Sequence, residues 1–139
     1  MHLLDTDTLT HLHAGHPRVI QRLRVVDDPD VGTTIITKVE LLRGRFDFLL
    51  KAATGSELLR AQQWLTRTEE LLAQIIIVQM NDASAIQFDQ LRIMKSLNKI
   101  GRADLLIASI TLAQRATLIT RNLDHFRHVP GLKVVNWVD

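Results

Sequence analysis

Short apolar runs alternate along the chain with longer segments in which apolar residues recur every three or four positions. The runs predict strands at His2–Asp5, Gly32–Thr37, Ile75–Val78, Thr117–Thr120 and Lys133–Asn136. The periodic segments predict helices after Asp5 (interrupted at Gly15–Pro17), from Thr37, and over residues 56–73, 82–97, 104–113 and 123–126. Strands that alternate with helices are typical of an open parallel sheet with helices on both faces, so we expect an α/β fold.

The chain has no internal repeat, linker or low-complexity stretch, and its 139 residues suit one domain spanning 1–139. Its 46% of hydrophobic residues excludes a disordered chain, and no apolar run approaches the roughly 20 residues that cross a bilayer. No secretory leader is recognisable and there is no cysteine, which together predict a cytoplasmic protein without disulfides. The formal net charge of +2 excludes a strongly basic nucleic-acid coat.

Acidic side chains stand at the ends of apolar elements. Asp5 closes the first expected strand, Glu40 follows the second, and Asp104 begins a helix that is apolar nearly all round. Sites in open parallel sheets form beyond the carboxyl ends of the strands, so we expect these three acids to converge there. Clustered, partly buried carboxylates raise one another's pKa values unless a cation lies between them. Oxygen ligands favour Mg2+ or Mn2+, so the pattern predicts a divalent metal site, which Asn122, Asp124 or Asp7 would complete.

Glu40, Asp104 and the neighbouring Asp7 also have purely structural explanations. The helix after the first strand needs an N-cap, which Thr6 or Asp7 would supply. The pattern from Thr37 to Glu40 matches a capping box, in which the two residues satisfy each other's backbone N–H groups. Asp104 would favour the positive end of its helix without any metal.

Other polar side chains near these positions are candidates for contacting a polyanionic substrate. Arg102 and Arg121 are suited to binding phosphate, and Thr6 and Thr120 to orienting water or phosphate. Solvated surface arginines and turn or cap hydroxyls are the simpler alternative. Zinc is disfavoured, because the closely spaced histidines near the N-terminus fall on different sides of a helix.

Four segments in order resemble the PIN-domain ribonucleases, specifically the VapC-type toxins of prokaryotic toxin–antitoxin pairs. They are Leu3–Asp7, Thr37–Leu41 with Gly44, Ala103–Ala108, and Leu118–Asn122 with Phe126, and the ending Val129–Trp137 is similar as well. The resemblance implies a single PIN-like domain in which Asp5, Glu40 and Asp104 are catalytic metal ligands. The family's fourth position, often an aspartate, falls on Asn122 here, and Asp7 replaces its usual Asn or Ser.

The same resemblance implies an Mg2+-dependent (or Mn2+-dependent) endoribonuclease that hydrolyses RNA phosphodiester bonds as the toxin of a toxin–antitoxin pair. It further implies a cognate antitoxin protein as partner and assembly as a homodimer. Asn122 in place of an acid leaves open a catalytically altered PIN-fold module that only binds RNA or protein. A phospho-acceptor signalling domain is disfavoured, because it needs an aspartate after the third strand, where the chain has Gln79 and Met80.

Overall fold

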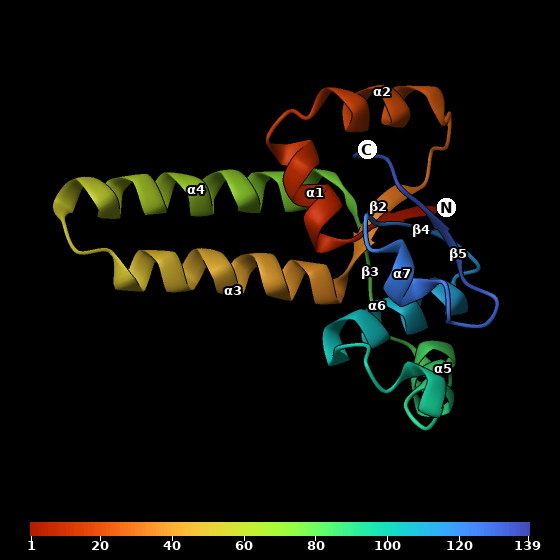
Figure 1. Ribbon diagram of the computed structural model, residues 1–139. Helices are drawn as coiled ribbons and strands as arrows, with labels where there is room; N and C mark the ends of the chain where they lie inside the picture. Colours follow the sequence, from red (N-terminus) through yellow and green to blue (C-terminus); the bar gives the residue numbers. More distant parts are fainter.

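The computed structural model describes all residues, 1–139, around a five-stranded sheet (Figure 1). The strands are β1 (His2–Leu4), β2 (Val31–Thr34), β3 (Ile76–Val78), β4 (Thr117–Ile119) and β5 (Lys133–Val135), in spatial order β3-β2-β1-β4-β5 with every pair parallel. The helices are α1 (Thr6–His13), α2 (Pro17–Val25), α3 (Ile35–Lys51), α4 (Gly55–Gln74), α5 (Asp82–Leu91), the 3₁₀ turn η1 (Lys95–Leu97), α6 (Arg102–Ala113) and α7 (Leu123–Phe126). The predicted open parallel α/β sheet is confirmed.

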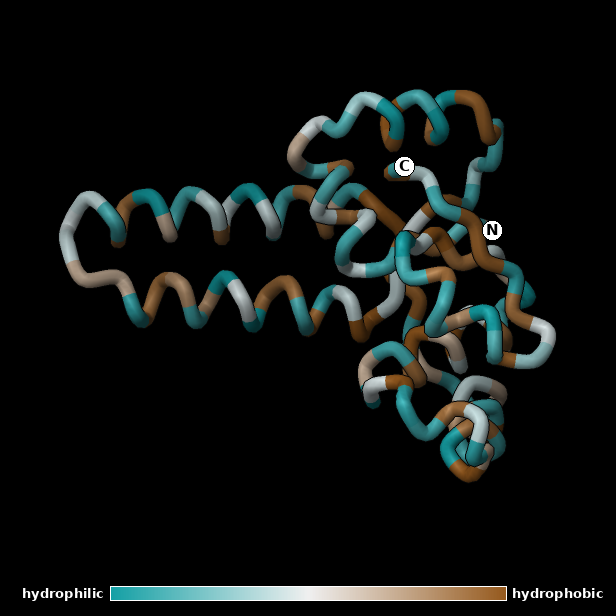
Figure 2. The backbone as a smooth tube through the Cα atoms, viewed as in Figure 1, coloured by the Kyte–Doolittle hydropathy of each residue, from teal (hydrophilic) through white to brown (hydrophobic).

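Both faces of the central strands are buried. Successive side chains of a strand point to opposite faces, so Leu3 packs with residues of α6 whereas Leu4 packs with residues of α1, α2 and α4. Strand β4 repeats the arrangement, with Leu118 on the α6 side and Ile119 on the other. Figure 2 shows these strands as a hydrophobic centre between the helices. The expected helical cover on both faces is therefore confirmed.

Strand β2 is held tightly between its two neighbours. A Cβ atom at Gly32 would lie 2.2 Å from the backbone oxygen of Ile76 in β3, so only glycine fits at this close approach. On the other side, the Thr33 hydroxyl donates a hydrogen bond of 2.6 Å to the carbonyl oxygen of Leu4 in β1. The carboxyl ends of β1 and β2 are thereby fixed relative to each other.

Several boundaries differ from the sequence-based expectation. β2 ends at Thr34, which caps α3 by accepting a hydrogen bond of 3.2 Å from the N–H of Thr37. The capping-box prediction for Thr37 and Glu40 is therefore wrong, because both residues lie inside α3. The helix expected over 82–97 is α5 followed by the separate turn η1, and α6 starts two residues before Asp104.

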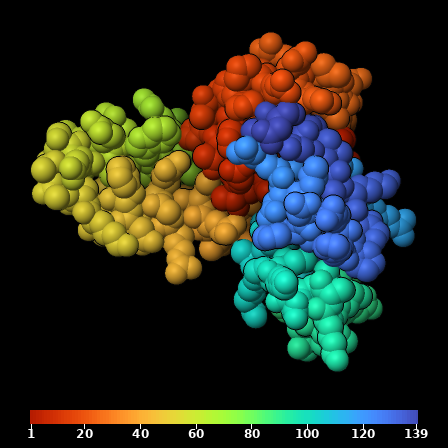
Figure 3. All heavy atoms as spheres, in the orientation of Figure 1, coloured from red at the N-terminus to blue at the C-terminus, as the bar shows by residue number.

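Helices α3 and α4 pack against each other as a long hairpin that projects away from the sheet (Figures 1 and 3). The base of α3 meets α1 and α6, which places its first turns beside the carboxyl ends of the strands. None of the helices is both long enough and apolar enough to traverse a lipid bilayer.

Candidate metal centre

A cavity of about 330 Å³ opens where β1 and β4 end. None of its lining residues is hydrophobic; they are Asp5, Thr6, Asp7, Glu40, Asp104, Arg121 and Asn122. The first three follow β1 and the last two follow β4, while α3 contributes the glutamate and the first turn of α6 contributes Asp104. The fold thus brings together acids that are far apart in the sequence, and we call this hollow the acidic cavity.

Asp5 is positioned by the junction between β1 and α1. Its backbone N–H donates to the carbonyl oxygen of Ile119 at 3.0 Å, which continues the pairing of β1 with β4. Its Oδ1 atom accepts a hydrogen bond of 2.8 Å from the N–H of Thr8, so Asp5 itself is the N-cap of α1. The prediction that Thr6 or Asp7 caps this helix is wrong. The cap engages only Oδ1, and the side chain still lines the cavity.

Thr6 and Glu40 connect α1 to α3. The Thr6 hydroxyl donates to Oε1 of Glu40 at 2.6 Å and lies 3.2 Å from the hydroxyl oxygen of Thr37, which is fully buried. Thr6 therefore orients a carboxylate, whereas the sequence suggested that it would orient water or phosphate. Thr37 lies one helical turn before Glu40, so the two contacts of Thr6 together hold the base of α3 against α1.

Asp104 lies at the third position of α6 and is half-buried. Burial raises the pKa of its carboxyl group, the Glu40 and Asp5 carboxylates raise it further, and His125 partly offsets these effects. The His125 Nδ1 atom lies 3.9 Å from Oδ2 of Asp104 and 2.6 Å from Nδ2 of Asn122. His125 was not among the predicted site residues; its spacing of three from Asn122 at a helix start was the only signal.

Arg121 stands at one side of the acidic cavity. Its Nη1 atom is 3.9 Å from Oδ2 of Asp7, and its Nε atom donates to Oδ2 of Asp139 at 3.2 Å. Arg121 is the only cation among the lining residues, so it offsets part of the charge of four carboxylates. Asn122 lines the cavity beside it, held by a hydrogen bond of 3.0 Å from its N–H to the Thr120 hydroxyl.

Three residues singled out from the sequence lie elsewhere. The Asp124 side chain is 84% exposed and pairs with Arg127 at 3.4 Å, and it does not line the acidic cavity with the other predicted metal ligands. Thr120 is fully buried and its hydroxyl serves the turn, which rules out substrate contact. The guanidinium of Arg102 lies 5.4 Å from the ring centroid of Phe88 and does not line the cavity.

The donor set of the acidic cavity fits a hard divalent cation. Apart from the guanidinium of Arg121 and the amide nitrogen of Asn122, every polar side-chain atom that lines the cavity is an oxygen. Mg2+ and Mn2+ prefer oxygen ligands. No three Asp, Glu or His side chains stand close enough to enclose an ion by themselves. Mg2+ keeps several of its water ligands and takes only one or two carboxylates, so it suits this more open arrangement. The three acids thus converge on one cavity without forming a closed cage.

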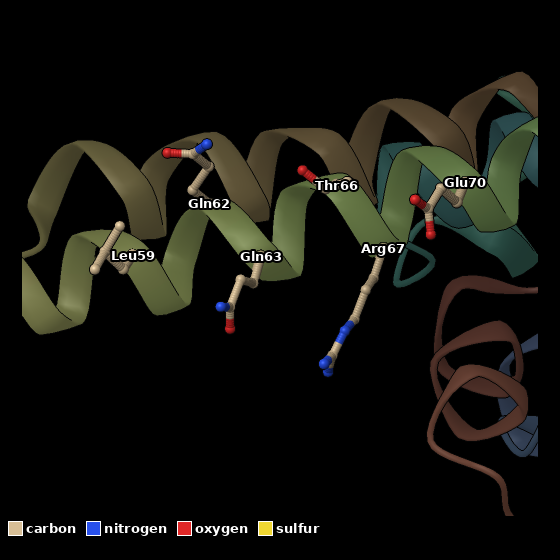
Figure 4. Close-up of a pocket in the computed structure, with 6 residues that line it drawn as sticks. All are labelled: Leu59, Gln62, Gln63, Thr66, Arg67 and Glu70. Atoms are coloured by element: carbon tan, nitrogen blue, oxygen red, sulfur yellow. The ribbon is translucent and has the colours of Figure 1, made fainter.

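A second hollow, of about 410 Å³, follows the surface of α4 (Figure 4). All of its lining residues come from this one helix: Leu59, Gln62, Gln63, Thr66, Arg67 and Glu70. It combines one cation and one carboxylate with amides, and no residue of another element completes it. It offers no set of converging acids, which leaves the acidic cavity as the candidate centre.

Comparison with known proteins agrees with this fold. Ribonuclease VapC1 of Haemophilus influenzae strain R2866 is 25% identical over 141 residues, covering 99% of this chain and 98% of that protein. Ribonuclease VapC2 of Rickettsia felis is 50% identical over 38 residues, which span 27% of this chain and 28% of that protein. A solved toxin–antitoxin complex from Klebsiella pneumoniae contains a chain that is 25% identical with a TM-score of 0.70, covering 97% of this chain and 96% of that one. The PIN domain itself matches residues 2–132, nearly the whole length, and this chain belongs to the PIN-domain family.

Proposed function

We propose that this protein is a divalent-metal-dependent endoribonuclease of the cytoplasm that acts as the toxin of a toxin–antitoxin pair. The observation that carries the proposal is the acidic cavity, where Asp5, Glu40 and Asp104 meet from three separate elements. The similarity to Ribonuclease VapC1 along nearly the whole chain supports RNA as the substrate. A cavity of carboxylates repels a polyanion unless a cation lies between them, so the substrate and the metal requirement are linked.

In this proposal, Asp5, Glu40 and Asp104 would hold the cation, and Mg2+ is the first candidate. When bound, a divalent cation supplies Lewis-acid stabilisation of the negative charge that develops on the scissile phosphate. The chain's own groups position it: Thr6 holds Glu40 by a hydrogen bond of 2.6 Å, and the α1 cap fixes Asp5. Arg121 is placed at the side of the cavity to contact a phosphate oxygen.

The partners follow from the same site and its relatives. The similar chain from Klebsiella pneumoniae was solved in a toxin–antitoxin complex, which supports a cognate antitoxin for this chain. Four carboxylates and one guanidinium line the cavity, so a basic side chain of the antitoxin would be attracted to it. A homodimer remains part of the proposal, and size-exclusion chromatography with light scattering measures it directly.

The experiment is an RNA cleavage assay with the purified protein in Mg2+, in Mn2+ and in EDTA. We expect cleavage in either metal, none in EDTA, and background activity for Asp5→Asn and Asp104→Asn, because each change removes an anionic ligand. Asp89→Asn is the matched control, since Asp89 carries the same group on α5, where it pairs with Arg92 outside the cavity, and this variant should retain full activity. Circular dichroism checks that every variant is folded. Full activity of Asp104→Asn or of the wild type in EDTA would overturn the proposal.

One observation favours a second candidate, a PIN-fold module that binds RNA or protein without cutting it. An amide, Asn122, lines the cavity at the position where the resemblance to the ribonucleases places an acid, and the fourth carboxylate comes from Asp7 instead, so the arrangement of the charges differs. The same assay separates the two functions, because the binding module would hold RNA in Mg2+ without producing fragments.

A further inference from the structure

A third hollow, of about 390 Å³, adjoins the acidic cavity at His125. It is lined by Lys95, Ser96, Asn98, Lys99, Ile100, Asp124, His125 and His128. His125 connects the two hollows, because it lines this one and its Nδ1 atom lies 3.9 Å from Oδ2 of Asp104, which lines the acidic cavity. We call this hollow the basic hollow; Figure 3 shows the segment near residue 100, in cyan, against the C-terminal segment in blue.

The fold gives the basic hollow a firm base. Leu97 of η1 and Phe126 of α7 are both buried in the hydrophobic cluster that α6 and β4 share. The backbone N–H of Ile100 donates to the carbonyl oxygen of Leu97 at 3.1 Å, which folds the loop back on itself before α6 begins. The polar residues next to these anchors are left on the outside, so they keep a fixed place relative to α6 and Asp104.

The positive charges of the basic hollow are not neutralised by acidic side chains of the protein. Lys95 and Lys99 are exposed and take part in no ion pair. Asp124, its only acid, is already paired with Arg127 at 3.4 Å. Ser96, Asn98 and the two histidines add hydrogen-bonding groups around the lysines. A positive hollow therefore stands directly beside a negative one.

We propose that the basic hollow binds a backbone phosphate of the RNA strand next to the phosphate held in the acidic cavity, with Lys95 and Lys99 as its contacts. This inference rests on the proposed function, because it assumes that the acidic cavity takes an RNA phosphate. An RNA strand carries a phosphate at every nucleotide, so a neighbouring site of positive charge gains affinity where the carboxylates alone repel the chain. Contacts of this kind set the position of a strand without reading its bases.

The test compares Lys95→Ala/Lys99→Ala with the matched variant Lys51→Ala/Lys133→Ala. Lys51 ends α3 at the tip of the hairpin, and Lys133 is the first residue of β5, at the amino ends of the strands and away from the acidic cavity. The two variants therefore lose the same charge at different places. Binding of a labelled single-stranded phosphorothioate oligouridine, chosen to resist cleavage, is measured in Mg2+ at several concentrations of monovalent salt, and KM and kcat are measured in Mg2+ with unmodified RNA. For the Lys95/Lys99 variant we expect about tenfold weaker binding, a higher KM with kcat retained, and a salt slope that is lower by about 0.7 for the one phosphate that the lysines neutralise.

Every outcome bears on one proposal or the other. Unchanged affinity and salt slope in the Lys95/Lys99 variant, an equal loss in the control variant, or no RNA binding by the wild type would overturn this inference. If the two lysines were needed to bind a polyglutamate peptide but not RNA, the hollow would recognise an acidic protein and the inference would be wrong. RNA binding that depends on the two lysines, without any cleavage, would support the phosphate site and overturn the proposed nuclease activity. Cleavage with the same KM in the Lys95/Lys99 variant would support the nuclease activity and overturn the phosphate site.

Discussion

The carboxylate of Asp5 has two tasks, and two substitutions separate them. Asn is as good an N-cap as Asp, so Asp5→Asn removes the charge while α1 keeps its cap. Asp5→Ala removes both, and the hydrogen bond of 2.8 Å to the N–H of Thr8 is lost. We expect urea unfolding to show Asp5→Ala to be less stable than Asp5→Asn by about 0.5–2 kcal/mol. Both variants should be inactive on RNA; equal stability of the two would mean that the cap contributes nothing.

Asp28 gives the protein a defined acid sensitivity. The hydrogen bond from His2, followed by the N–H of Asp30, lowers the pKa of the Asp28 carboxyl group from 3.8 to about 2. A lowered pKa stabilises the folded state above the unfolded value of 3.8, and this contribution is lost as the pH falls toward 2. We therefore expect Asp28→Asn to lower the unfolding midpoint at neutral pH, and the difference from wild type to vanish near pH 2. Thermal unfolding across this range checks it; a difference that does not depend on pH would contradict it.

At the scale of elements, the close approach of β2 and β3 leaves no room for a side chain. A Cβ atom at Gly32 would meet the backbone oxygen of Ile76 at 2.2 Å, and a backbone atom in a paired strand cannot move aside cheaply. We expect Gly32→Ala to destabilise the protein by at least about 1–3 kcal/mol in denaturant unfolding. Gly44→Ala is the matched control, because a Cβ at this position inside α3 meets nothing within 4 Å. It should be neutral or slightly stabilising, since Ala has the higher helix propensity.

The elements themselves could be predicted from the sequence, but several of their ends could not. Thr34 and Thr37 are both suitable caps for α3, and the choice between them depends on where β2 stops pairing with β3, at Thr34 opposite Val78. Pairing of this kind joins segments far apart in the chain, so local patterns do not reveal it. The same limit explains why Asp5, at the end of an apolar strand, was not predicted as the cap of α1.

The candidate site could also be predicted from the sequence only in part. Acids at element ends predicted that Asp5, Glu40 and Asp104 would share one cavity, because topology alone brings the carboxyl ends of parallel strands together. Side-chain direction within the turn after β4 was not predictable. Asn122 faces the cavity and Asp124, two residues later, faces solvent and Arg127.

At the scale of the whole molecule, the acidic cavity concentrates negative charge in a chain whose formal net charge is +2. A cation that binds only the folded state stabilises it by mass action, about 2.7 kcal/mol at a concentration of one hundred times Kd. We expect the thermal midpoint to rise with added Mg2+ or Mn2+ and this rise to be largely lost in Asp104→Asn. Asp124→Asn should respond as the wild type does. An equal rise in Asp104→Asn would place the stabilising ion elsewhere.

The acidic cavity draws on residues as far apart in the chain as Asp5 and Asp104. A ribosome releases the N-terminal part first, and α1 and α3 can form before α6 exists. A nascent chain therefore lacks the third acid until about three quarters of it has been made, as residue 104 of 139 shows. Incomplete products that stop before α6 would carry no complete ion site, so the hazard of a nuclease to the cell making it begins only after α6 has been translated.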